Sequence, residues 1–98
     1  MPRSGPYAFL LRLRTASTLA TYRRYQATGP RIAAAAARSQ LHTVQSRQAE
    51  TVAALPRGTH VLYRTHSVLA AVAVETDARN YRALERIRGV ARVYPIAP

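Results

Sequence analysis

The chain has 98 residues, of which 48% are apolar, and this length allows one domain with a small hydrophobic core. Its 15 basic residues are all arginine and stand against 4 acidic residues, giving a net charge of +11, so the chain will attract polyanions non-specifically at low salt. The absence of cysteine excludes disulfides, a thiolate nucleophile and cysteine-ligated metal sites.

The apolar segments are short. The longest runs, residues 33–37 and 68–74, fall far below the roughly 20 residues needed to span a bilayer. Residues 7–11 form an apolar run that Arg12 interrupts, too short for the hydrophobic region of a secretory signal peptide. We therefore expect no membrane partner, and no signal peptide within this chain. Residues 1–6, rich in proline and glycine, are expected to be a disordered lead-in.

The first half of the chain predicts a strand, a loop and a long helix. Residues 7–13 (YAFLLRL) are apolar and end in alternation, which is typical of a strand. Residues 15–30 show no clear period and predict a long loop, with a helical turn around residues 19–25. Residues 31–55 predict a helix, because one face recurs at spacings of 3 and 4 residues. That face comprises Leu41, Val44, Gln48, Val52 and Leu55.

The second half predicts two strands, a helix and a last strand. Residues 59–65 form a strand with Val61, Tyr63 and Thr65 on one face, and residues 68–74 form an almost wholly apolar strand expected at the centre of the sheet. Residues 78–88 form a helix that Thr76 or Asp77 caps. Residues 90–94 form the last strand, and residues 95–98 form an extended tail that cannot be a central strand, because Pro95 and Pro98 lack a backbone donor.

This order of elements predicts an α+β fold of the ferredoxin-like type, β-α-β-β-α-β. The fold would have a four-stranded antiparallel sheet with two helices on one face. The predicted domain covers residues 7–94, between the lead-in and the tail.

Four segments resemble, in order, the propeptide of subtilisin-like serine proteases, and most closely those of large multi-domain bacterial members. The segment YAFLLRL is similar to their opening strand, and Leu19–Tyr22 (LATY) matches a motif that follows it. The predicted long helix resembles their arginine- and glutamine-rich first helix. The closing ALERIRGVARVYPI is similar to the family's L-x-x-x-x-G-V-x-x-V-x-P ending. The resemblance covers residues 7–96.

The resemblance implies a non-catalytic domain that acts as an intramolecular chaperone and then as a competitive inhibitor of its protease. The C-terminal tail would lie in the substrate cleft, where an extended chain adds backbone hydrogen bonds. The protease-binding residues would be Tyr94, Pro95, Ile96, Ala97 and Pro98. The domain would be secreted as part of a protease precursor and monomeric when free.

The chain departs from the family pattern in three ways. Some family members have acidic residues in the tail that could cap helix N-termini of the enzyme, whereas the matching residues here, 94–96, are uncharged. The turn before the predicted third strand has Ser67 and Val68 where the family has an Asn-Gly or Asn-Ala pair. Segments of a catalytic domain are absent, so the chain is open to three interpretations: an excised domain, a truncated gene product or a stand-alone inhibitor.

No residue pattern predicts catalysis, a metal or a cofactor. His42, His60 and His66 lack the spacing of a helical metal site and have no carboxylate near them in the sequence, so they are expected to be surface residues. Ser67 follows His66 in a turn, and sequence adjacency does not make a nucleophile–base pair. We expect neither a catalytic site nor a bound cofactor.

The arginines leave a second class of function open. Arg79, Arg82 and Arg86 share one predicted helix face, and such a face is either solvated or contacts phosphates. The alternative function is therefore a basic ferredoxin-like nucleic-acid-binding module. RNA-recognition modules of this fold class stack bases on aromatic residues of the central strands, whereas residues 68–74 contain only Val, Leu and Ala. A third hypothesis is a small regulatory or dimerisation domain.

Overall fold

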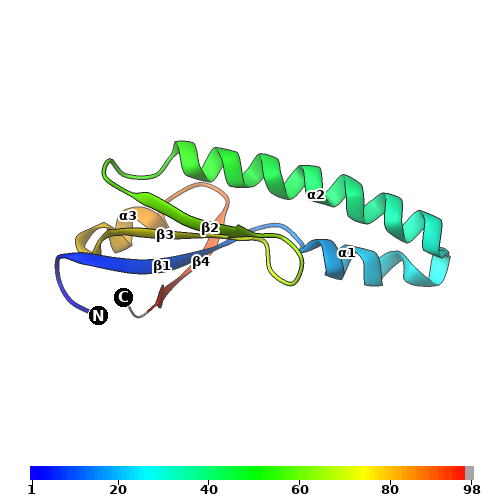
Figure 1. Cartoon of the computed structure of the whole chain (residues 1–98), viewed down its shortest axis with the longest axis horizontal. Helices are drawn as coiled ribbons and strands as arrows, with labels where there is room; N and C mark the ends of the chain where they lie inside the picture. The colour runs from blue at the N-terminus through cyan, green and yellow to red at the C-terminus, as the bar shows by residue number, and fades with distance from the viewer. Residues whose placement is uncertain (97–98) are drawn as a thin grey trace.

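The computed structural model describes residues 1–96 and shows one sheet with helices packed along it and beyond its end (Figure 1). Its strands are β1 (Pro6–Leu13), β2 (His60–Thr65), β3 (Ala71–Asp77) and β4 (Val90–Ile96). Its α-helices are α1 (Thr18–Tyr25), α2 (Pro30–Ala53) and α3 (Tyr81–Glu85). Two short 3₁₀ helices, η1 (Gln26–Thr28) and η2 (Ala78–Asn80), precede α2 and α3.

The four strands form an antiparallel sheet in the order β2-β3-β1-β4. The predicted α+β class, the four-stranded antiparallel sheet and the central place of the third strand are therefore confirmed. The predicted number of helices is wrong, because residues 1–96 contain three α-helices and the element order is β-α-α-β-β-α-β. The additional helix is α1, in the segment predicted to be a loop with a helical turn.

The core lies between one face of the sheet and the helices α2 and α3. Phe9 and Leu11 of β1 and Val72 and Val74 of β3 are fully buried there, with Val44 of α2 and Leu84 of α3 in the same cluster. Because both helices contribute to this one cluster, they cover the same face of the sheet. The stacked rings of Phe9 and Tyr81, 5.7 Å apart, join the central strand to α3.

Helix α2 begins and ends within two residues of its predicted limits, 31–55. Pro30 suits the first helical position, since a proline lacks the N–H that would there have no helical partner. Of the predicted inner face, Val44 and Gln48 are buried, and Val52 and Leu55 pack against the core cluster. Its 24 residues span about 36 Å, so the helix extends well past the end of the sheet (Figure 1).

Helix α1 packs beside the first half of α2 and forms a helical hairpin with it through η1. All four of its first N–H groups find partners. Thr18 and Leu19 donate to the carbonyls of His66 and Ser67 in the β2–β3 turn, at 2.8 and 3.0 Å. Ala20 donates to the Ser17 hydroxyl at 3.1 Å, and Thr21 to the Ser17 carbonyl at 3.1 Å. Partners 48 residues away in the chain thus complete the helix start, which a local pattern cannot reveal.

Two strand predictions need correction. A bulge at Leu62 shifts the register of β2, so that Val61 pairs with Val74 on the core side whereas Tyr63 and Thr65 pair with Ala73 and Ala71 on the opposite side. The prediction that these three residues share a face is therefore wrong. Strand β3 starts at Ala71, three residues later than predicted. Val68 lies in the preceding turn, 80% exposed.

The predicted helix 78–88 is shorter and in two parts, η2 and α3. Its predicted cap is confirmed at Asp77, whose carboxylate accepts a hydrogen bond from the Arg79 N–H at 2.9 Å. The inner side of this segment consists of Leu84 and Ile87, which are buried, and Tyr81, which packs on the core. Strand β4 begins where predicted and runs two residues further, to Ile96.

Candidate functional site: the open sheet face and its C-terminal edge strand

The helices leave the second face of the sheet uncovered, and we call it the open face. Side chains alternate between faces along a strand, so the residues between the core positions of β1 and β3 point to this side. Cross-strand register aligns them in rows that run across the sheet. The central row consists of Tyr63, Ala73, Leu10 and Tyr94, one residue from each strand.

The central row combines small and aromatic side chains. Ala73 is fully buried under its neighbours and Leu10 is partly buried, whereas Tyr63, on the edge strand β2, is 51% exposed. Leu10 and Tyr63 line a shallow hollow of about 450 Å³ that continues along residues 64–69. A surface of this kind, low in the middle with aromatic side chains at the edges, can receive a convex apolar partner surface.

The rows on either side differ in charge. One consists of Thr65, Ala71, Arg12 and Arg92, and the other of His60, Glu75, Ala8 and Ile96. The guanidinium of Arg92 lies 5.3 Å from the ring centroid of Tyr94, a cation–π distance that holds the two side chains together. The open face therefore has one basic border and one mixed border around an apolar centre.

The predicted protease-binding residues fall partly in the sheet. Tyr94, Pro95 and Ile96 belong to β4 and pair with Leu10, Phe9 and Ala8 of β1. The predicted strand ended at residue 94 and was followed by a tail over residues 95–98, whereas the pairing with β1 continues through Pro95 to Ile96. Ala97 and Pro98 lie outside the described residues. Pro95 is compatible with β4 because this strand is at the edge of the sheet.

The position of β4 gives its backbone two roles. Its inner side is paired with β1, and its outer side has no strand beside it in the described sheet. An edge strand with free donors and acceptors can pair with an extended segment of a partner. The strand that leads to the C-terminus therefore forms one edge of the open face and can also pair with the backbone of a partner.

The histidines are dispersed. His42 is exposed on α2, His60 is exposed on β2, and His66 lies in the β2–β3 turn, where its Nδ1 is 3.2 Å from the Thr18 hydroxyl. Within residues 1–96, His, Asp and Glu nowhere gather in a group of three that would suit a metal ion. His66 and Ser67 act through their backbone carbonyls, as partners for α1.

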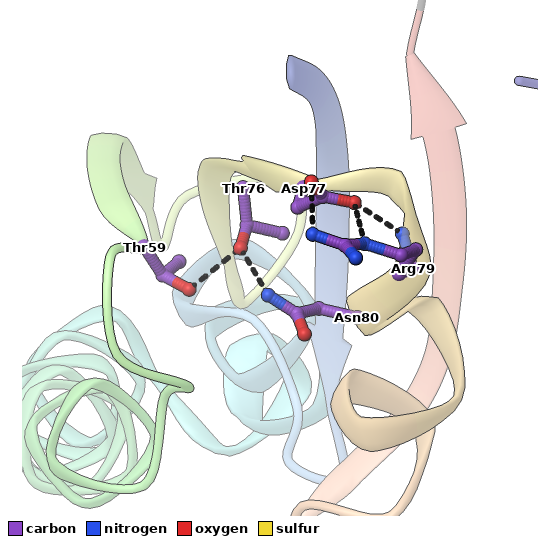
Figure 2. Close-up of polar contacts among 5 residues, drawn as sticks. All are labelled: Thr59, Thr76, Asp77, Arg79 and Asn80. Atoms are coloured by element: carbon purple, nitrogen blue, oxygen red, sulfur yellow. Dashed lines mark hydrogen bonds and ion pairs between the residues drawn. The ribbon is translucent and has the colours of Figure 1, made fainter. Parts of the chain in front are cut away.

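The arginines predicted to share one face have different surroundings. The Arg79 side chain pairs with Asp77 at 3.1 Å, and its hydrogen bond holds the pKa of the Asp77 carboxyl below its ordinary value of 3.8. Arg82 and Arg86 are exposed. Figure 2 shows that Arg79 lies beside a second cluster, in which Thr76 accepts hydrogen bonds from Thr59 at 2.9 Å and Asn80 at 2.8 Å. These contacts fix the end of β3 and the start of η2.

Sequence reasoning missed three residues of the central row: Leu10, Tyr63 and Ala73. The signal for Leu10 and Ala73 was present, since both alternate with core residues on strands that were correctly identified. The signal for Tyr63 was hidden, because the bulge at Leu62 moves it to the face opposite Val61.

Comparisons of this chain with protein-family models, curated proteins and solved structures found no match. No helix in residues 1–96 combines the length and the apolar character needed to cross a membrane.

Proposed function

We propose that this chain is the propeptide domain of a subtilisin-like serine protease, an intramolecular chaperone that then becomes a competitive inhibitor. The observation that carries the proposal is the open sheet face, with its row of Tyr63, Ala73, Leu10 and Tyr94, next to the edge strand that leads to the C-terminus. The order of sequence motifs that resemble the propeptide family supports the same function.

We also infer a ferredoxin-like fold with one inserted helix. If α1 and η1 are set aside, the remaining order is β-α-β-β-α-β, and the sheet order β2-β3-β1-β4 agrees with a split β-α-β arrangement. The insertion lies at one end of the sheet, so it leaves the open face uncovered (Figure 1).

Inhibition of this kind requires no catalytic group in the chain. The open face would pack on the surface of the protease, and the chain from Tyr94 onward would enter the substrate cleft, where the enzyme contacts it as it contacts a substrate. A folded sheet behind the tail reduces the entropy lost on binding, because the segment is already extended and oriented. We therefore also propose that the domain binds such a protease, is secreted with it and catalyses no reaction itself.

The test is a titration of the domain into a bacterial subtilisin that cleaves a chromogenic peptide, at about 0.15 M salt to suppress non-specific charge effects. We expect competitive inhibition that a deletion of residues 94–98 abolishes. Because residues 94–96 pair with β1, circular dichroism must accompany that variant to show that the sheet remains folded.

A second variant tests the open face with β4 intact. Tyr63→Glu places a charge in the central row and is expected to weaken inhibition about tenfold or more, because a charge that an apolar partner surface covers loses its hydration. Gln45→Glu, on the exposed side of α2, makes the same change of charge and is expected to leave inhibition unaltered. Equal effects of the two variants would contradict the proposed interface.

The second candidate function is a basic nucleic-acid-binding module. It predicts salt-dependent binding to nucleic acid that charge reversal at Arg82 and Arg86 removes. The central strands carry Leu10 and Ala73 in the middle of the open face, where a base-stacking module needs aromatic side chains, and both tyrosines of this row lie on edge strands. The protease inhibitor is therefore the function that we favour.

A further inference from the structure

The helical hairpin of α1 and α2 ends in an exposed tip, which we define as residues 23–32. Every residue of the tip except Gly29 is exposed. Figure 1 places the tip and the end of β4 at opposite ends of the long axis of the molecule, which measures 50 Å. A partner bound at the tip would therefore leave the open sheet face and β4 accessible.

The tip combines positive charge with exposed apolar side chains. Arg23, Arg24 and Arg31 are its charged residues, and the first acidic residue of the sequence is Glu50. The two ion pairs within residues 1–96, Arg47–Glu50 and Arg79–Asp77, do not involve the tip. Tyr25 is 37% exposed and Ile32 is 50% exposed.

We propose that this tip binds the surface of an anionic lipid bilayer, with its arginines at the headgroups and with Tyr25 and Ile32 in the interfacial layer. Basic residues gain energy near anionic headgroups, and apolar side chains that project between them gain by leaving water. Arg24 lies over the ring of Tyr25 at 5.7 Å, a pairing that suits the boundary between charged and apolar layers.

The exposed isoleucine favours lipid over nucleic acid as the anionic partner. Phosphates of DNA or RNA contact arginines, and aromatic rings stack on bases, but an aliphatic side chain such as Ile32 gains little from either contact. A contact with a bilayer surface also needs no membrane-spanning segment. The absence of a spanning segment, which led us to expect no membrane partner, therefore does not bear on this mode of binding.

The experiment is sedimentation of the full chain with vesicles of phosphatidylcholine containing about one-third phosphatidylglycerol, and with vesicles of phosphatidylcholine alone, at about 0.15 M salt. We expect binding to the anionic vesicles only. Each arginine near such a surface contributes about fivefold to partitioning, so R23E/R24E should reduce binding at least about tenfold. Tyr25→Ser combined with Ile32→Ser should also reduce it, through the lost apolar contact.

The control is R82E/R86E, which changes the net charge by the same amount at two exposed residues, one on α3 and one directly after it, away from the tip. It is expected to retain binding within about threefold. Equal losses for the two arginine pairs would assign binding to overall charge and overturn the proposal. Three other results would also overturn the proposal. They are full binding by the Tyr25/Ile32 variant, tighter binding to a DNA duplex than to the vesicles, and no binding to anionic vesicles at all.

Discussion

At the scale of single residues, Gln48 joins the long helix to the sheet. It is buried, and its side-chain amide donates two hydrogen bonds to the sheet. One goes to the carbonyl of Thr65 at the end of β2, at 2.8 Å, and the other to the carbonyl of Ala71 at the start of β3, at 3.2 Å. Its position on the helical face was predicted from spacing alone. Its partners were not, because they lie on two strands whose register the sequence leaves open.

The Gln48 contact gives the first prediction. Gln48→Leu keeps the volume but removes the donor for two carbonyls beneath α2, so we expect the free energy of unfolding to fall by about 2 kcal/mol. Urea denaturation followed by circular dichroism measures it. Gln45→Leu, on the exposed side of the same helix, is the control, and a loss as large as that of Gln48→Leu would refute the role of the buried amide.

The Asp77 carboxylate gives the second prediction, which concerns pH. The hydrogen bond from Arg79 lowers the pKa of Asp77 in the folded state, so this carboxylate stabilises the fold above the unfolded-state pKa, and the effect is lost as pH falls through the folded-state pKa. Asp77→Asn retains a capping oxygen and removes the charge. We expect the wild type to be the more stable at neutral pH, and the difference to shrink below about pH 4. Denaturation at several pH values measures it; a difference that grows on acidification would contradict the assignment.

At the scale of elements, α1 is stable because the β2–β3 turn supplies hydrogen-bond acceptors for its first N–H groups. In isolation a helix of 8 residues is unstable in water. Here the Ser17 cap, the carbonyls of the β2–β3 turn and the side of α2 support it. The sequence showed only a weak helical tendency around residues 19–25, because the supporting contacts come from distant segments.

This arrangement gives the third prediction. Ser17→Ala removes the side-chain partner of the Ala20 N–H and should destabilise α1 by about 1 kcal/mol. Because α1 is outside the main core, we expect the effect as roughly fivefold faster hydrogen exchange in α1, with little change in β1 and β3. Ser46→Ala, on the exposed surface of α2, is the control. Equal acceleration throughout the sheet would mean that α1 and the core open as one unit.

At the scale of the whole molecule, charge works against folding. A net charge of +11 on 98 residues is accompanied by two ion pairs within residues 1–96, and both are at the surface. Like charges repel one another when the chain is compact, and salt screens that repulsion. The small core between one sheet face and two helices has to offset this cost.

The fourth prediction follows from that balance. Raising the salt concentration from about 0.01 M to about 0.3 M should raise the melting temperature, because the Debye length falls from about 30 Å to well below the dimensions of the domain. Thermal unfolding followed by circular dichroism in sodium chloride measures this shift. A melting temperature independent of salt would show that repulsion among the arginines has no appreciable effect on stability.

The sequence by itself determined the features that depend on local periodicity and on chain-breaking residues. These are the apolar strand β1, the long helix α2 with Val44 and Gln48 inward, the central β3, and the Asp77 cap. Tertiary structure decided the bulge at Leu62, the support of α1 by His66 and Ser67, and the continuation of β4 to Ile96. Each depends on backbone hydrogen bonds between segments far apart in the chain, whose register no local pattern encodes. The row of Tyr63, Ala73, Leu10 and Tyr94 depends on that register, so the candidate site emerged only when the four strands were paired.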